Sequence, residues 1–184
     1  DTTVTTLNAS TYGAGGFSGY KTAYNHKSCG VTNVTVTGNG SEHGGIVGRM
    51  TGGTVDSSYV QDSTVNGPSK IGGIAGAHLG GTISHSTVTR SLVNATDSYA
   101  GGIVGLFGNT EGSHGALRQT FVTDTDIRAN VFAGGITGGL KYPLVNYSYI
   151  ERLYFEGSVL ATGGRGSGIG SGDAYNDEIT RSFK

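Results

Sequence analysis

Small residues and β-branched residues alternate along this chain in one recurring order. The unit reads small-x-Val-x-x-small-x-Val, and it is clearest in residues 58–65, 86–93 and 120–127, where Ile replaces the last Val of the third copy. In an extended strand, residues i and i+2 face the same side, so each triplet turns a small residue and a β-branched residue to one face. The two residues between the triplets shift this phase, which predicts two short strands that meet at a corner.

A glycine-led phrase precedes each copy of this unit. It reads Gly-Gly-Ile-Val-Gly at its clearest, and its copies begin at Gly15, Gly44, Gly72, Gly101 and Gly134. These starts are 29, 28, 29 and 33 residues apart. A fixed period of this size is typical of a solenoid, a propeller or a repeat array. We therefore predict an all-β fold, a parallel β-solenoid (β-helix) of either hand, with about five to six coils and a period of 28–29 residues.

Three rival folds fit the pattern less well. A helix requires apolar residues at i, i+3, i+4 and i+7, and glycine at 35 of 184 positions would destabilise it. Collagen requires glycine at every third residue. A propeller blade typically needs about 40 residues and four strands, which exceeds the period seen here.

In a solenoid, residues one period apart become vertical neighbours, and two columns test the alignment. The inward column is predicted to stack Val60, Val88, Val122 and Ile150, with five extra residues in the fourth coil and none in the fifth. The corner column is predicted to contain Asn33, Asp62, Arg90, Asp124 and Arg152. The charges in this column alternate in sign from Asp62 onward, so we expect ion pairs between successive coils, with Arg90 and Asp124 within reach of each other.

The repeat divides the chain into three segments. Residues 1–14 contain a Thr-rich strand that would form a cap or an arm, residues 15–171 contain the solenoid, and residues 172–184 form a polar C-terminal segment. The extra residues of the fourth coil fall between Leu106 and Ala116 and predict a surface loop. No amphipathic helix suited to capping is visible, so neighbouring domains or stacked copies would cover the ends.

The composition argues against some classes of binding partner. The formal net charge is -1 and only 14% of residues are charged, which argues against nucleic acid and anionic membranes. No stretch approaches the roughly 20 apolar residues that cross a bilayer, so we expect no membrane insertion. A chain that begins Asp-Thr-Thr-Val looks mature or excised. Low charge and abundant Ser, Thr, Gly and Asn favour an extracellular or cell-surface location.

The glycine-led phrase, followed by a Gly-rich turn and an Ile/Val-x-x-Ser-x-Val segment, resembles the GLUG-motif repeats. These repeats occur in bacterial immunoglobulin A peptidases and in surface and filamentous adhesins. The resemblance covers about residues 15–160, and the first copy departs from it with Phe17 and Ser18 in place of the aliphatic pair. In that family the repeats are non-catalytic, stalk-like or adhesive parts of large secreted proteins. The resemblance therefore implies an extracellular module and carries over no catalytic residue.

The residues that bear chemistry are dispersed. The five histidines and the single cysteine, Cys29, suggest no converging ligand set, so we expect no metal and no cofactor. Cys29 stands where other coils place Ser or Thr, which indicates a small buried filler. Asp124 and Asp126 could share a face as a glycosidase pair would, but a solvated edge fits them better, and we expect no catalytic residues.

Two outward columns are candidate ligand surfaces. Tyr59, Phe121 and Tyr149 share one position and would form an aromatic strip that binds sugar rings or packs against a partner. A Thr column beside it is interrupted by Gln61 and Glu151, which argues against an ice-binding grid. Five Asn-x-Ser/Thr triplets are candidate N-glycosylation acceptors, at Asn8, Asn33, Asn39, Asn94 and Asn146.

These patterns favour a non-catalytic structural or adhesive module of a secreted or cell-surface protein, whose partner is a protein or a glycan. Two alternatives stay open. One is a self-assembling extracellular filament subunit that stacks end to end, and the other is a carbohydrate-active β-helix enzyme or an ice-binding protein.

Overall fold

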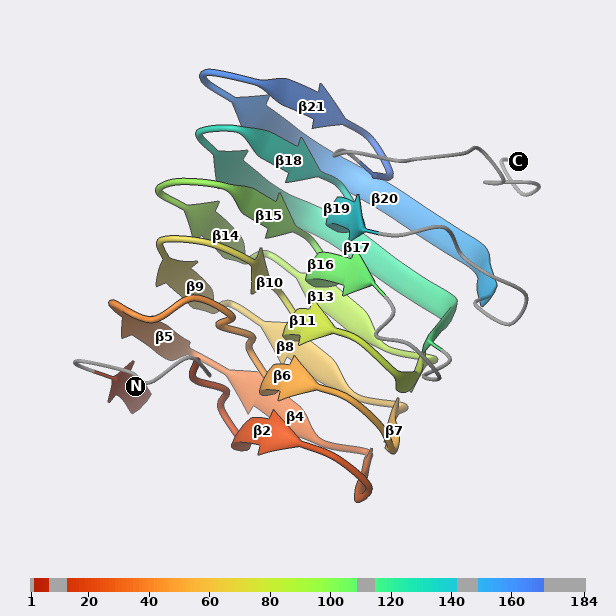
Figure 1. The fold of residues 1–184 in the computed structure, drawn as a ribbon. Coiled ribbons are helices and arrows are strands. Elements are labelled where there is room, and N and C mark those ends of the chain that lie inside the picture. Colours follow the sequence, from red (N-terminus) through yellow and green to blue (C-terminus); the bar gives the residue numbers. More distant parts are fainter. Residues whose placement is uncertain (1, 7–12, 109–114, 142–148, 171–184) are drawn as a thin grey trace.

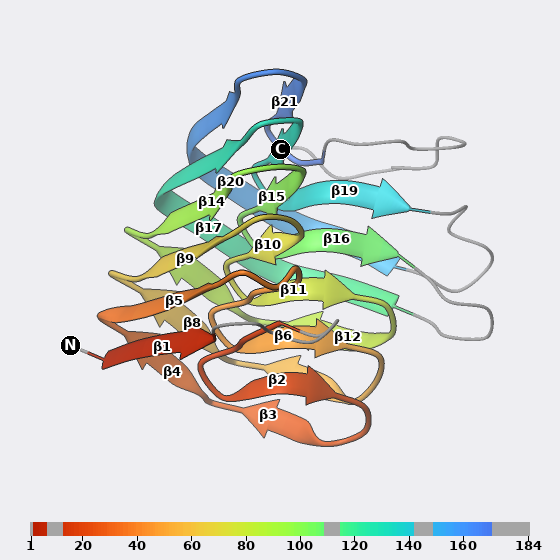
Figure 2. The same ribbon diagram turned by 60° about the vertical axis from the view of Figure 1, so that its left-hand side comes forward.

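The structure is a computed structural model, and it describes residues 2–6, 13–108, 115–141 and 149–170. Every element in these residues is a β-strand, and all strand pairs are parallel. The strands wind as coils stacked one on another, which confirms the predicted parallel β-solenoid (Figures 1 and 2). Segments 109–114 and 172–184, which contain the predicted loop and the polar tail, lie outside the described residues.

Three sheets form the sides of the solenoid. The five-stranded sheet contains β2 (Ser18–Lys21), β6 (Val47–Met50), β11 (Ala75–His78), β16 (Val104–Gly108) and β19 (Thr137–Lys141). The four-stranded sheet contains β10 (Ile71–Gly72), β15 (Tyr99–Gly101), β18 (Phe132–Gly134) and β21 (Arg165–Ser167). The five-stranded sheet has one strand from each coil, so about four full turns separate its first strand from its last.

The third sheet has twelve strands and forms the long side opposite the five-stranded sheet (Figure 1). Its strands are β1 (Thr2–Thr6), β3 (Asn25–Lys27), β4 (Gly30–Thr32), β5 (Val34–Gly38), β7 (Thr54–Asp56), β8 (Tyr59–Gln61), β9 (Thr64–Gly67), β12 (Gly81–Ser84), β13 (Thr87–Thr89), β14 (Leu92–Ala95), β17 (Gly115–Ala129) and β20 (Tyr149–Ala161). Each of the first three coils contributes three short strands to it, whereas β17 and β20 cross the whole side as single strands.

Two corners divide each of these coils into short strands. At each corner one residue other than glycine adopts φ near +50°, for example Ser57 at 52° and Asp62 at 50°. The left-handed conformation costs roughly 1–2 kcal/mol for such a residue. It also resets the in-out alternation, so that Tyr59 is exposed, Val60 is buried and Ser63 is buried again. The predicted corner between the triplets is therefore present at Asp62, and it is the second corner of the coil, because a first corner precedes it at Ser57.

The inward column confirms the stacking and corrects its last member. Val60 pairs with Val88, and Val88 pairs with Val122, but Val122 pairs with Phe155 and not with Ile150. Ile150 instead pairs with Leu117, five residues earlier in the register. The prediction was wrong there because the fifth coil has extra residues before β20, as the fourth coil has before β17.

The same shift removes Arg152 from the predicted corner column. Arg152 has φ 55° and lies in β20 between the partners of Arg118 and Thr120, which places it beside Gln119 at the first corner. The register of β17 and β20 slips between Thr123 and Thr125, so the fifth coil has no residue opposite Asp124. The second corner is thus absent from the fifth coil.

The second glycine of each phrase allows neighbouring coils to touch. A Cβ atom at Gly73 would lie 2.1 Å from the Gly102 carbonyl oxygen and 2.7 Å from Val88 Cγ2. Only glycine fits such an approach, because real Cβ atoms do not come that close to a backbone oxygen. The repeated Gly-Gly of the sequence therefore reflects contact between coils.

A buried carboxylate ties the start of the second coil to its neighbours. The Glu42 side chain is 2% exposed, and Arg49 Nη1 and Lys70 Nζ each lie 2.9 Å from its Oε1 atom. Its backbone N–H donates to the Ser69 carbonyl oxygen at 2.9 Å. Glu42 thereby joins the second coil to the turn that leads into the third.

We expect Glu42→Gln to lower the free energy of unfolding by about 2 kcal/mol, because it removes the charge that two cations share in a buried site. Glu151→Gln is the control, since Glu151 faces Arg118 at 3.6 Å with both side chains exposed. That change should stay within about 0.5 kcal/mol. Urea denaturation measures both, and equal losses would contradict this role for Glu42.

His78 is a titratable group held in the core. It is 0% exposed, it packs on Phe107 with ring centroids 5.0 Å apart, and neither ring nitrogen has a hydrogen-bond partner among the described residues. Burial lowers the pKa of His78 from 6.5 to about 4, an effect that the nearby Gly81 backbone opposes only in part. The folded protein therefore keeps this imidazole neutral at a pH where the unfolded chain protonates it.

Stability should be greatest above pH 6.5 and should fall as the pH approaches 4, because protons then favour the unfolded chain. The contribution of His78 to this loss reaches about 3 kcal/mol. His78→Met, which matches the stacked neighbour Met50, should remove most of that contribution from a pH series of urea midpoints. An unchanged acid slope in His78→Met would contradict the assignment to His78.

Candidate functional site

The outward side of the twelve-stranded sheet carries a column of exposed rings, which we call the aromatic strip. It consists of Tyr59, Phe121 and Tyr154, which are 44%, 44% and 45% exposed. Tyr59 pairs with Thr87, Thr87 pairs with Phe121, and Phe121 pairs with Tyr154, so the rings lie in one line along the solenoid. A gap one coil wide separates Tyr59 from Phe121, at Thr87.

The strip replaces Tyr149 of the prediction with Tyr154. Tyr149 pairs with Ala116, five positions before Phe121 in β17, because of the extra residues in the fifth coil. Its side chain lies outside the described residues. Tyr59 and Phe121 share the column as predicted.

Local contacts hold the rings in place. The ring of Tyr59 lies over Gly30 of the first coil, where a Cβ atom would be 2.3 Å from Tyr59 Cζ. The rings of Phe121 and Tyr154 have centroids 6.5 Å apart and are tilted by 43°. The Tyr154 hydroxyl donates to Glu156 Oε2 at 2.9 Å, and this bond to a carboxylate raises the pKa of Tyr154. The phenol therefore stays protonated.

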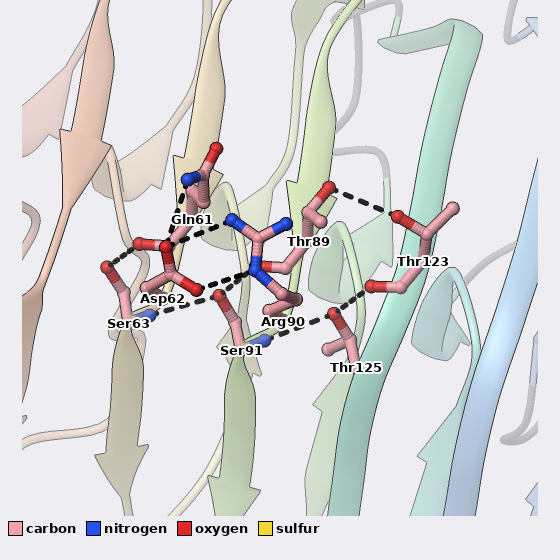
Figure 3. A network of polar contacts seen from close by, with 8 residues as sticks. All are labelled: Gln61, Asp62, Ser63, Thr89, Arg90, Ser91, Thr123 and Thr125. Atoms are coloured by element: carbon pink, nitrogen blue, oxygen red, sulfur yellow. Dashed lines mark hydrogen bonds and ion pairs between the residues drawn. The ribbon is translucent and has the colours of Figure 1, made fainter.

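On one side of the strip lies the second corner, which is shown in Figure 3. Arg90 Nε and Nη2 donate to Asp62 Oδ1 and Oδ2 at 2.8 and 3.1 Å, and Gln61 Nε2 donates to Asp62 Oδ2 at 2.9 Å. These hydrogen bonds lower the pKa of Asp62, and the bond from Arg90 has the largest effect. Between the corner and the strip, the hydroxyls of Thr89 and Thr123 are hydrogen-bonded at 3.1 Å.

The alternating corner column is thus present from Asp62 to Asp124, but its pairing differs from the prediction. Arg90 binds Asp62 of the preceding coil, whereas we expected it to reach Asp124. Asp62 has the largest effect in raising the pKa of Arg90, and the charge of Asp124 adds to it. Arg90 and Asp124 line one depression, so both lie on one face. The bidentate geometry with Asp62 explains the choice, because two parallel N–H···O bonds favour one carboxylate over another.

Beyond the corner, a shallow open depression is lined by Arg90, Asp124, Asp126 and Arg128. Asp126 accepts hydrogen bonds from Ser158 Oγ and, at 3.0 Å, from Arg128 Nη2. These hydrogen bonds lower the pKa of Asp126, and the bond from Ser158 has the largest effect. Asp124 and Asp126 line this one depression, as the glycosidase alternative requires, but it is open to solvent, and Asp126 is engaged with Ser158 and Arg128.

On the other side of the strip, the charges are also paired. Asp56 Oδ1 accepts from Ser84 Oγ and from His85 Nδ1, each at 2.8 Å, and these bonds lower the pKa of Asp56. Arg118 and Glu151 form an ion pair at 3.6 Å. The aromatic strip is therefore flanked on both sides by side chains of both charge signs.

A ladder of hydroxyls supports the corners from inside. The corner residue Asp62 still donates its N–H to a backbone carbonyl, that of Thr89 at 3.2 Å. The next N–H, of Ser63, donates instead to the Ser91 hydroxyl at 3.2 Å, and the N–H of Ser91 donates to Thr125 Oγ1 at 3.4 Å (Figure 3). Each hydroxyl in turn donates to the carbonyl two residues before it, as Ser91 does to Thr89 at 2.8 Å.

Sequence reasoning described these positions only as small. A signal was present, because the second, third and fourth coils place Ser or Thr there while the first coil has Cys29 and Val34. The N–H groups of Cys29 and Val34 donate to the hydroxyls of Ser58 and Ser63, each at 3.2 Å. The hydroxyl serves the coil before it, and only the strand β1, which pairs with β5, is described ahead of the first coil.

The remaining candidate residues are scattered. Asn33 and Asn39 are exposed, and Asn94 is half-buried and donates to Asn66 Oδ1 at 2.6 Å, while Asn8 and Asn146 lie outside the described residues. Within the described ranges, no three His, Cys, Asp or Glu side chains gather as metal ligands. No helix in the part of the chain that the structure describes is long and apolar enough to span a membrane.

Comparisons with family models, with curated proteins and with solved structures find no match to this chain. The resemblance to GLUG-motif repeats therefore stays a prediction. The candidate site rests on the geometry of the aromatic strip and of the paired ions beside it.

Two buried threonines provide a matched test of the hydroxyl ladder. Both are 0% exposed, but Thr125 Oγ1 accepts from Ser91 and donates to the Thr123 carbonyl at 2.8 Å, whereas Thr120 Oγ1 has no partner among the described residues. Thr125→Val should cost about 1–3 kcal/mol, because it strands a buried N–H, and Thr120→Val should cost less than about 0.5 kcal/mol. Thermal and urea unfolding measure both variants. Equal costs would show that these hydroxyls do not support the corners.

Proposed function

We propose that this chain is a non-catalytic, structural and adhesive β-solenoid module of a secreted or cell-surface protein. The observation that carries the proposal is the aromatic strip, three aligned rings that are nearly half exposed on a regular sheet face. Exposed aromatic side chains aligned on one surface typically mark contact sites.

The state of the nearby carboxylates supports a binding role over a hydrolytic one. A glycosidase requires one carboxylic acid whose pKa is raised so that it can protonate the leaving oxygen. Asp56, Asp62 and Asp126 accept hydrogen bonds that lower their pKa values instead. These groups serve the geometry of the face and are poorly suited to general acid catalysis.

The coil architecture supports a structural role. Each coil contacts its neighbours through strand pairing, the ladder of hydroxyls and the close approach at glycine, so a rigid rod forms without a large globular core. An extracellular setting follows from the low charge, the Ser- and Thr-rich composition and the GLUG-like phrases.

The rival functions fit these details less well. In a filament stacked in register, a preceding coil would find Cys29 where the ladder needs a hydroxyl, and β1 already pairs with β5 at Val34. An ice-binding Thr grid would be interrupted by Gln61 and by Glu156, which is the actual fifth member of that column.

Bead adhesion tests the proposal. Beads coated with the chain should adhere to at least one surface from a panel of polysaccharides, mucin and matrix proteins, and should release no new reducing ends or unsaturated products. The variant Tyr59→Ala/Phe121→Ala/Tyr154→Ala should lose the adhesion, because it removes the exposed rings. The matched control is Tyr24→Ala, since Tyr24 is 80% exposed in the first coil outside the strip.

Beads that adhere to nothing, or a polysaccharide that is cleaved by the chain, would contradict the proposal. Adhesion that survives the triple change but not Tyr24→Ala would move the contact to the first coil, and would contradict the role of the strip.

A further inference from the structure

We infer that the aromatic strip is a binding site for a neutral, extended polysaccharide that lies along the solenoid axis across several coils. The inference rests on the proposed adhesive function and specifies its ligand. Tyr59, Phe121 and Tyr154 provide the stacking surface, with Thr87 at the gap between the first two rings.

The direction of the strip selects a linear ligand. Strands of successive coils are about 4.8 Å apart, so Tyr59 and Phe121 are roughly 9.6 Å apart along the axis. Phe121 and Tyr154 are adjacent, with ring centroids at 6.5 Å. A chain of pyranose rings that runs along this line would meet successive aromatic rings with its apolar C–H faces. A compact ligand would contact only one or two of them.

The charges beside the strip select a neutral ligand. Asp62 is bound by Arg90 and Asp126 by Arg128 on one side, and Asp56 is bound by His85 and Glu151 by Arg118 on the other. On the first side, Asp124 also lines one depression with Arg90, and Glu156 accepts a hydrogen bond from the Tyr154 hydroxyl. A charged polymer is held by a surface of one sign, and these alternating pairs offer no such surface. Their remaining donors and acceptors suit hydroxyl groups, as do Gln61, Thr89 and Thr123 next to the rings.

The width of the strip argues against a protein partner or a second copy of this chain. The strip is one residue wide, with polar columns at both edges. A stable protein interface buries about 1,200–2,000 Å² around an apolar centre depleted of charged residues. Here charged side chains begin two or three positions from each ring, for example Asp56 and Asp62 on either side of Tyr59.

Calorimetric titration tests the ligand class with defined probes. Neutral hexasaccharides of glucose, xylose and mannose are compared with hexagalacturonate and a heparin hexasaccharide. We expect one of the neutral probes to bind, with an affinity that does not change between low and high salt. The triple variant Tyr59→Ala/Phe121→Ala/Tyr154→Ala should lower that affinity at least about tenfold, whereas Tyr24→Ala should leave it unchanged.

A gain-of-function variant separates stacking from unfolding. Thr87→Tyr fills the gap and creates four successive rings, and it should raise the affinity for the same probe about threefold. Circular dichroism and melting temperature check that both strip variants keep the fold.

The possible results each decide the inference. Binding of a charged probe alone, or salt-sensitive binding, would overturn the neutral class. Neutral binding that the triple variant retains would overturn the site. If no hexasaccharide binds while coated beads still adhere to a protein surface through the strip, the inference fails and the adhesive function stands. If no surface is bound, both fail.

Discussion

The hydrogen bond to a hydroxyl of the next coil, donated by the N–H that follows each corner, is the interaction on which the long side of the solenoid depends. A residue in the left-handed conformation resets the in-out alternation and turns the following N–H away from the strand ladder. Ser91 Oγ accepts a hydrogen bond from the N–H of Ser63, and its O–H donates to the Thr89 carbonyl. Without that hydroxyl, each corner would leave a buried donor without a partner in addition to its conformational cost.

The corners also position the outward side chains. Because Ser57 and Asp62 each reset the phase, the three residues between Ser58 and Asp62 present Tyr59 outward, Val60 inward and Gln61 outward. Repetition in each coil turns one such position into a column. The aromatic strip and the ion pairs beside it are therefore consequences of the same backbone device. The strip follows the first corner, which the fifth coil keeps at Arg152, and the charged column follows the second corner. In the fifth coil the second corner is missing, and the charged column ends at Asp124.

The period-2 triplets and the Gly-led phrase were sufficient to predict the fold class and one corner of each coil. They could not fix the register of the fifth coil. Its apolar residues fit the repeat in two registers that differ by five residues, one with Ile150 opposite Val122 and the other with Phe155 there. Residues 167–170 read Ser-Gly-Ile-Gly, a sixth and partial copy of the phrase. Ser167 pairs with Gly134, and that spacing would have revealed the extra residues. The ladder was also missed, since a requirement for small size and a requirement for a hydroxyl select the same residues, Ser and Thr.

The register of the fifth coil decides which rings form the strip, so a cross-link tests the central claim most directly. In a Cys29→Ser background, Phe121→Cys is combined with either Tyr154→Cys or Tyr149→Cys. Disulfides require Cα atoms within about 7 Å, and five residues of strand span about 16 Å. We expect Phe121→Cys/Tyr154→Cys to oxidise readily to an intrachain disulfide, because these positions are paired neighbours. Ready oxidation of the pair with Tyr149→Cys, and not of the pair with Tyr154→Cys, would contradict the register and the strip built on it.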